Sequence, residues 1–83
     1  MVLTGEITKD MLRIKKTRII LTNEAFARVG KVDWLFGRTN EFLVGDLFER
    51  KTYNVPGHVA IKPLDRNLCM NITLDEIKAV VIP

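Results

Sequence analysis

Short runs of alternating apolar and polar residues, separated by turn residues, dominate this chain. In its centre, Val32, Trp34 and Phe36 fall on one side of a two-residue period, and Lys31 and Asp33 fall on the other. Glycines bracket this run at Gly30 and Gly37. The pattern is typical of a half-buried strand that enters a turn. We therefore predict a strand over residues 29–36.

Similar runs elsewhere are rich in β-branched and aromatic residues and are bounded by turn signals. The predicted strands span residues 18–21, 29–36, 41–53, 57–62, 69–73 and 77–82, with a bend at Gly45. Frequent turn residues between short strands favour a mostly β fold, and closing such a sheet into a barrel protects its edges. We predict one domain over residues 1–83, a small SH3-like β-barrel of five to six short strands with one or two short helical turns.

Two segments are ambiguous between helix and strand. Residues 8–14 fit a short helix with Thr8 as N-cap, because their apolar positions do not alternate. Thr73 and Glu76 have the spacing of a capping box, which predicts one helical turn before a strand over residues 77–82. A full helix up to Ile82 remains the alternative for this second segment.

The predicted core follows from the inward positions of these strands. It includes most of the aromatic residues, which leaves few aromatic side chains for contact with a partner. Its members are Val32, Trp34, Phe36, Phe42, Val44, Phe48, Val59, Ile61, Ile77 and Val81.

Charge is the first feature that bears on function. The net charge is +3, and five basic residues with one acid lie between residues 9 and 18. Such a cluster is typical of contact with nucleic acid or another anion, although a solvated surface explains it as well. The candidate partner-binding residues are Lys9, Arg13, Lys15, Lys16, Arg18, Arg28, Lys31 and Arg38.

Part of the centre of the chain resembles the barrel subunit of H/ACA ribonucleoproteins. The resemblance rests on Gly30-Lys31-Val32-Asp33, then Phe36-Gly37, then Asn40-Glu41. In that family a strand reading Ile-Gly-Lys-Val-Asp leads into a Phe-Gly-Pro turn, whereas Arg38 stands here in place of the proline. The resemblance implies a barrel that docks on proteins during ribonucleoprotein assembly and is not itself the enzyme.

A longer stretch is similar to KOW and SH3-like barrels. It runs from Arg18-Ile19-Ile20-Leu21 through Val29-Gly30-Lys31-Val32 to Phe42-Leu43-Val44. The closing Leu74-Asp75-Glu76-Ile77 resembles the helical turn before the last strand of such barrels. This resemblance also implies a small module that binds nucleic acid or protein.

Residues for catalysis or metal binding are sparse. The chain has one cysteine, Cys69, and one histidine, His58. Nucleophilic catalysis requires a nucleophile, a base and an orienting group, and a zinc site requires several strong ligands. We therefore predict no enzyme activity, no metal site and no cofactor. A single cysteine and the absence of a secretory leader or membrane span favour the cytoplasm.

The sequence thus predicts a non-enzymatic binding module. Its partner is nucleic acid or a ribonucleoprotein, transcription or translation assembly, contacted through the basic residues. The alternative is a small protein-interaction adaptor, such as an accessory or phage protein, that contacts no nucleic acid. Homo-oligomerisation through an exposed edge or apolar patch stays open.

Overall fold

The computed structural model describes residues 1–14, 16–44, 58–66 and 68–83. In this part of the chain the strands are β1 (Val2–Thr4), β2 (Arg18–Leu21), β3 (Phe42–Val44), β4 (His58–Pro63), β5 (Met70–Thr73) and β6 (Ile77–Val81). The helices are α1 (Lys9–Leu12) and α2 (Asn23–Val32), with 3-10 turns η1 (Trp34–Gly37) and η3 (Leu74–Glu76). The predicted mostly β, barrel-like fold is confirmed.

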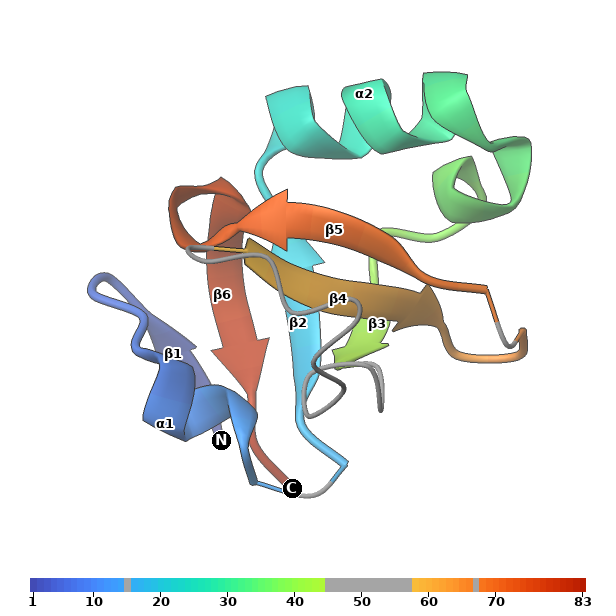
Figure 1. The fold of residues 1–83 in the computed structure, drawn as a ribbon. Helices are drawn as coiled ribbons and strands as arrows, with labels where there is room; N and C mark the ends of the chain where they lie inside the picture. The colour runs from blue at the N-terminus through green and yellow to red at the C-terminus, as the bar shows by residue number, and fades with distance from the viewer. Residues whose placement is uncertain (15, 45–57, 67) are drawn as a thin grey trace.

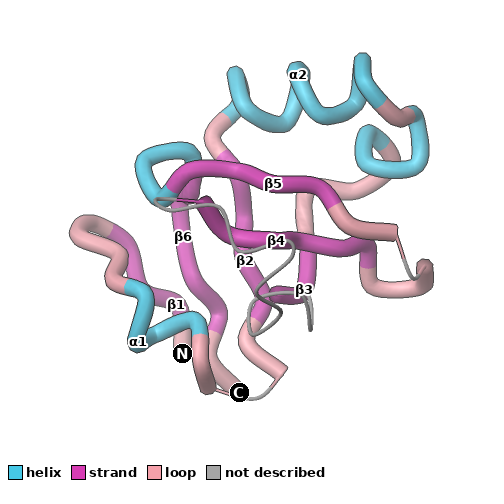
Figure 2. The backbone as a smooth tube through the Cα atoms, in the orientation of Figure 1, coloured by secondary structure: helices cyan, strands magenta, loops and turns pink. Residues whose placement is uncertain are grey.

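One antiparallel sheet contains all six strands, in the order β1-β6-β2-β3-β4-β5. In Figure 1, β6 runs down the view and β2 runs up beside it, while β4 and β5 run across the view, so the sheet curls around its inner face. Figure 2 shows α2 lying across one end of this curled sheet, and α1 near the other end, beside β1 and the chain termini.

The core lies inside the curl, where the inward side chains of the strands meet both helices and η1. Phe36 of η1 and Phe42 of β3 stack with ring centroids 5.8 Å apart, an arrangement that aromatic pairs favour. The buried cluster is made of Leu12, Ile19, Leu21, Ala25, Val29, Phe36, Phe42, Val59, Ile61, Ile72, Ile77 and Val80.

Several expected elements are confirmed. Strands β2, β4, β5 and β6 cover the segments predicted from β-branched runs, within about one residue at each end. A single turn, η3, lies between Thr73 and β6, so the alternative of a full helix up to Ile82 is wrong. Helix α1 forms with Thr8 at its N-cap position, but the Thr8 side chain makes no capping hydrogen bond.

The predicted strand over residues 29–36 is wrong. Helix α2 occupies its first half, up to Val32, and residues 34–36 lie in η1. The Thr22 hydroxyl caps this helix by accepting a hydrogen bond from the Ala25 N–H, at 3.2 Å. Ala25 and Val29, four residues apart, share the buried face of α2. The apolar spacing of the segment is therefore helical.

The core prediction needs matching corrections. Val32 and Trp34 are each 71% exposed, because α2 and η1 direct them outward. Val44 and Val81 are partly buried, and Phe48, like the rest of the strand predicted beyond Val44, lies outside the described residues. The sequence also missed β1, which pairs with β6. The remaining predicted core residues are buried: Phe36, Phe42, Val59, Ile61 and Ile77.

Candidate partner-binding surfaces

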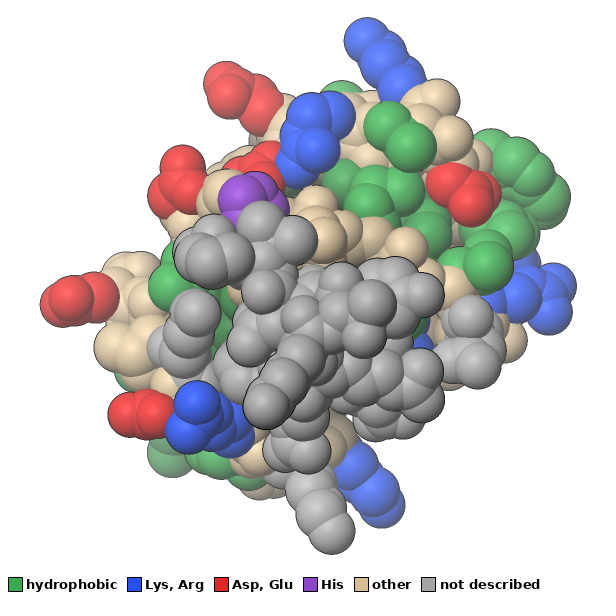
Figure 3. All heavy atoms as spheres, in the orientation of Figure 1, with side chains coloured by type: hydrophobic (Ala, Val, Ile, Leu, Met, Phe, Trp, Pro, Cys, Tyr) green, Lys and Arg blue, Asp and Glu red, His purple; other side chains and the backbone are tan. Residues whose placement is uncertain are grey.

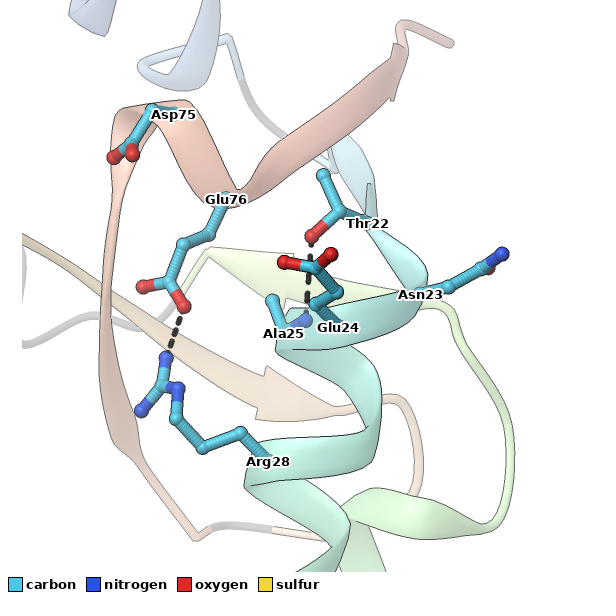
Figure 4. Close-up of a pocket in the computed structure, with 7 residues that line it drawn as sticks. All are labelled: Thr22, Asn23, Glu24, Ala25, Arg28, Asp75 and Glu76. Carbon is cyan, nitrogen blue, oxygen red and sulfur yellow. Dashed lines mark hydrogen bonds and ion pairs between the residues drawn. The ribbon is translucent and has the colours of Figure 1, made fainter.

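The N-terminal end of α2 forms one side of an open hollow of about 540 Å³ (Figure 4). Asp75 and Glu76 of η3 form the other side. Figure 4 shows Arg28 and Glu76 pointing toward one another across the hollow, while Asn23 points away from them. Its lining residues are Thr22, Asn23, Glu24, Ala25, Arg28, Asp75 and Glu76.

Hydrogen bonds of the fold occupy the main polar groups of this hollow. The Glu76 carboxylate accepts hydrogen bonds from the Thr73 N–H at 2.9 Å and from the Thr73 hydroxyl at 3.0 Å. It also forms an ion pair with the Arg28 guanidinium. Partial burial raises the pKa of the Glu76 carboxyl, but the bonds from Thr73 and Arg28 and the Arg28 charge outweigh it, so the net pKa is lowered. These contacts tie η3 to α2 and leave Glu76 ionised as a structural group.

The predicted basic residues do not gather at one place. Lys16 and Arg18 line one hollow with Leu43, Val81 and Pro83. Arg28 lines the hollow at the start of α2, and Arg38 lines a third, beside the end of β4. Lys9 is the first residue of α1, and Arg13 is the C-cap residue of this helix. The Arg13 guanidinium lies 4.0 Å from the Asp10 carboxylate. Lys15 lies outside the described residues.

Each of the four predicted arginines has an acidic partner, and for three of them the partner lies in another segment of the chain. The Arg18 guanidinium lies 2.9 Å from the Glu41 carboxylate, and that of Arg38 lies 3.5 Å from Asp65. The third, Arg28, pairs with Glu76. Lys16 and Lys31 are exposed, and Lys16 has a backbone φ of 64°. These ion pairs leave less uncompensated positive charge than the sequence indicates.

An apolar surface that the sequence did not predict lies where α2 meets η1. The chain reverses there because Gly30 and Gly37 are in close contact: a Cβ built on Gly30 would lie 3.0 Å from the Gly37 Cα. This contact holds Val32 and Trp34 outside the core. Leu35 shares a hollow of about 180 Å³ with Leu64, which is 41% exposed. We call Val32, Trp34, Leu35 and Leu64 the Trp34 surface.

Figure 3 shows hydrophobic side chains gathered at the end of the molecule where α2 and η1 meet, with a basic side chain at their border and an acidic one among them. A large exposed aromatic residue with aliphatic neighbours is a common feature of contact sites. Sequence reasoning missed this surface because it placed Trp34 in a strand. The available signal was Thr22 followed by the helix formers Glu24, Ala25, Ala27 and Arg28.

Other candidate groups carry little chemistry. Cys69 is exposed, and His58 begins β4. Within the described ranges, no three His, Cys, Asp or Glu side chains are grouped so that they could hold a metal ion. No helix in the same ranges has both the length and the apolar composition needed to cross a membrane.

No protein-family model matches this chain, and searches of curated proteins and of solved structures find no match. We therefore infer the function from the geometry of the surfaces.

Proposed function

We propose that this chain is a non-enzymatic binding module that docks on a protein partner through the Trp34 surface. The observation that carries the proposal is the exposure of Trp34, at 71% of its area, at the start of η1. Tryptophan is enriched among the residues that contribute most to protein–protein affinity. Burying such a side chain against a partner removes a large apolar area from water, which stabilises the complex.

Two features favour a protein partner over nucleic acid. Arg18, Arg28 and Arg38 are already paired with carboxylates of the same chain, so phosphate contact would have to compete with these ion pairs. The neighbours of Trp34 on its surface are aliphatic, which suits apolar side chains of a protein. The non-enzymatic character agrees with the structural use of Glu76 and Arg28 in the hollow at the start of α2.

Affinity capture from a native lysate tests the proposal, with nuclease-treated and untreated samples compared. The wild-type chain is expected to retain a defined set of proteins after nuclease treatment, and Trp34→Ala is expected to lose that set. Val2→Ala is the matched control, because Val2 is also an exposed apolar residue, 62% exposed, but lies in β1. Equal capture by the wild-type chain and Trp34→Ala would refute docking through the Trp34 surface.

Nucleic-acid binding through the basic residues is the second candidate, with a ribonucleoprotein assembly as its setting. One observation favours it: Lys16 and Arg18 line the same open hollow of about 460 Å³. Phosphate contacts there would give an affinity that falls steeply as salt is added. Charge reversal at Lys16 should then weaken oligonucleotide binding, while Trp34→Ala should not. An oligonucleotide affinity that changes neither with salt concentration nor in Lys16→Glu would rule this candidate out.

A further inference from the structure

The charges around the Trp34 surface bear on which partner it accepts. Asp33 uses a carboxylate oxygen to accept a hydrogen bond from the Leu35 N–H, at 3.0 Å. Asp65 faces the Arg38 guanidinium at 3.5 Å. Asp65 is therefore paired with a cation, whereas Asp33 is bonded to a neutral amide and keeps its negative charge.

Two cations that are close to this surface in the chain have no carboxylate partner among the described residues. Lys31 lies in the last turn of α2, three residues before Trp34, and Arg66 follows the turn formed by Leu64 and Asp65. Both side chains are exposed, and the described part of the chain offers neither an ion pair. Within the described residues, the Trp34 surface consequently has an apolar centre, and its rim carries two unpaired cations, Lys31 and Arg66, against one carboxylate without a cationic partner, Asp33. The net charge of the rim is therefore positive.

A binding surface of this composition selects its partner by charge as well as by apolar area. Complementary charge at a rim speeds association and rejects partners of the wrong sign, while a central tryptophan supplies most of the affinity. Resting on the function proposed above, we infer that the Trp34 surface recognises an acidic segment of a partner protein. Such a segment carries one or two large apolar side chains next to Asp or Glu.

Single-stranded nucleic acid also offers negative charge, but it fits this surface less well. Proteins that bind single strands stack successive bases on several aromatic side chains. In the described part of the Trp34 surface the other members are Val32, Leu35 and Leu64, which are aliphatic. Aliphatic neighbours pack against leucine or phenylalanine of a peptide and provide no second stacking platform.

Selection from a displayed library of random peptides tests the inference, because it requires no identified partner. The wild-type chain is expected to enrich peptides in which Asp or Glu flanks Leu, Phe or Trp. Their affinity should fall at least about tenfold in Trp34→Ala, the loss expected of a central contact residue. The double variant Lys31→Glu with Arg66→Glu should bind these peptides several-fold more weakly and should enrich basic peptides. Lys78→Glu, at an exposed position in β6, is the charge-matched control.

Each other outcome has a distinct meaning. Trp34-dependent peptides that are neutral or basic would overturn the acidic preference and leave the proposed docking function standing. Failure to enrich any Trp34-dependent peptide, with both proteins shown to be folded by circular dichroism, would overturn the inference and the proposed function together. Trp34-dependent binding of random-sequence single-stranded RNA or DNA, measured in parallel, would replace the acidic peptide with nucleic acid.

Discussion

The side-chain amide of Asn40 makes two hydrogen bonds with the backbone of Leu21, one in each direction and each 2.9 Å long. Asn40 Oδ1 accepts from the Leu21 N–H, and Asn40 Nδ2 donates to the Leu21 carbonyl oxygen. The backbone pairing of β2 with β3 reaches only from Arg18 to Ile19, so the amide takes the place of further ladder bonds at the end of β2. The Asn40 side chain therefore belongs to the fold.

Replacing Asn40 with alanine should lower the free energy of unfolding by about 1–3 kcal/mol, because two partly buried backbone groups lose their partners. Equilibrium unfolding in urea measures the change. Amide exchange at Leu21 should speed up in the same variant. Thr39→Ala, at a neighbouring exposed position, is the control and should change stability by less than about 0.5 kcal/mol. Equal stability of both variants would contradict a structural role for the Asn40 amide.

The contact between Gly30 and Gly37 gives a second prediction. A Cβ added to Gly37 would lie 3.1 Å from the Gly30 Cα, so the backbones of α2 and η1 would have to move apart. We expect Gly37→Ala to cost about 1–3 kcal/mol of stability, as overpacking does. Gly30→Ala should cost less, because alanine is favoured over glycine inside a helix by about 1 kcal/mol.

Thermal and urea unfolding of both glycine variants measure these costs. Lys31→Ala is the control, since Lys31 lies in the same helix and is exposed. Its stability should match the wild type within about 0.5 kcal/mol. If Gly37→Ala were as stable as Lys31→Ala, the close packing of α2 on η1 would be wrong.

The lowered pKa of Glu76 predicts how stability depends on pH. Because the folded-state pKa of the Glu76 carboxyl lies below its ordinary value of 4.5, the stabilisation is complete above about pH 4.5 and is lost as the pH falls through the folded value. Glu76→Gln should therefore be less stable than the wild type at pH 7. The difference should shrink as the pH falls from about 5 toward about 3.

Urea unfolding over this pH range measures that difference. Glu6→Gln removes a carboxylate from an exposed position and serves as the control. A stability difference between Glu76→Gln and the wild type that stays constant across the whole range would contradict the ionised, hydrogen-bonded state of Glu76.

Local sequence signals were sufficient where one rule decided the structure. The β-branched runs in β2, β4 and β6 predicted strands, and the Thr73–Glu76 spacing predicted the turn η3. In each of these segments, propensity, apolar period and flanking turn residues agree. Strand β1 has only three residues and forms through pairing with β6, which is a long-range contact that a local pattern does not contain.

The error at residues 29–36 arose where two periods overlap. Val32, Trp34 and Phe36 alternate in the sequence, but α2 ends at Val32 and η1 begins at Trp34, so the three residues belong to two different elements. The chain reverses its direction between α2 and η1, where Gly30 and Gly37 are in close contact. This contact depends on the tertiary fold, so a local sequence pattern does not contain it. The same error hid the Trp34 surface. The ion pairs that neutralise Arg18, Arg28 and Arg38 join separate elements in the same way.

Trp34 and Phe36 provide the sharpest test of the fold, because a strand would bury both. Here Trp34 is 71% exposed and Phe36 is 1% exposed. Phe36→Ala should destabilise the chain by about 3–5 kcal/mol, whereas Trp34→Ala should change stability by less than about 0.5 kcal/mol.

Trp34 is the sole tryptophan, so intrinsic fluorescence reports on it alone. Its emission should resemble that of tryptophan in water, be quenched readily by acrylamide, and shift little on unfolding. A blue-shifted, quencher-resistant emission in the native state would place Trp34 in the core and would remove the basis for the Trp34 surface.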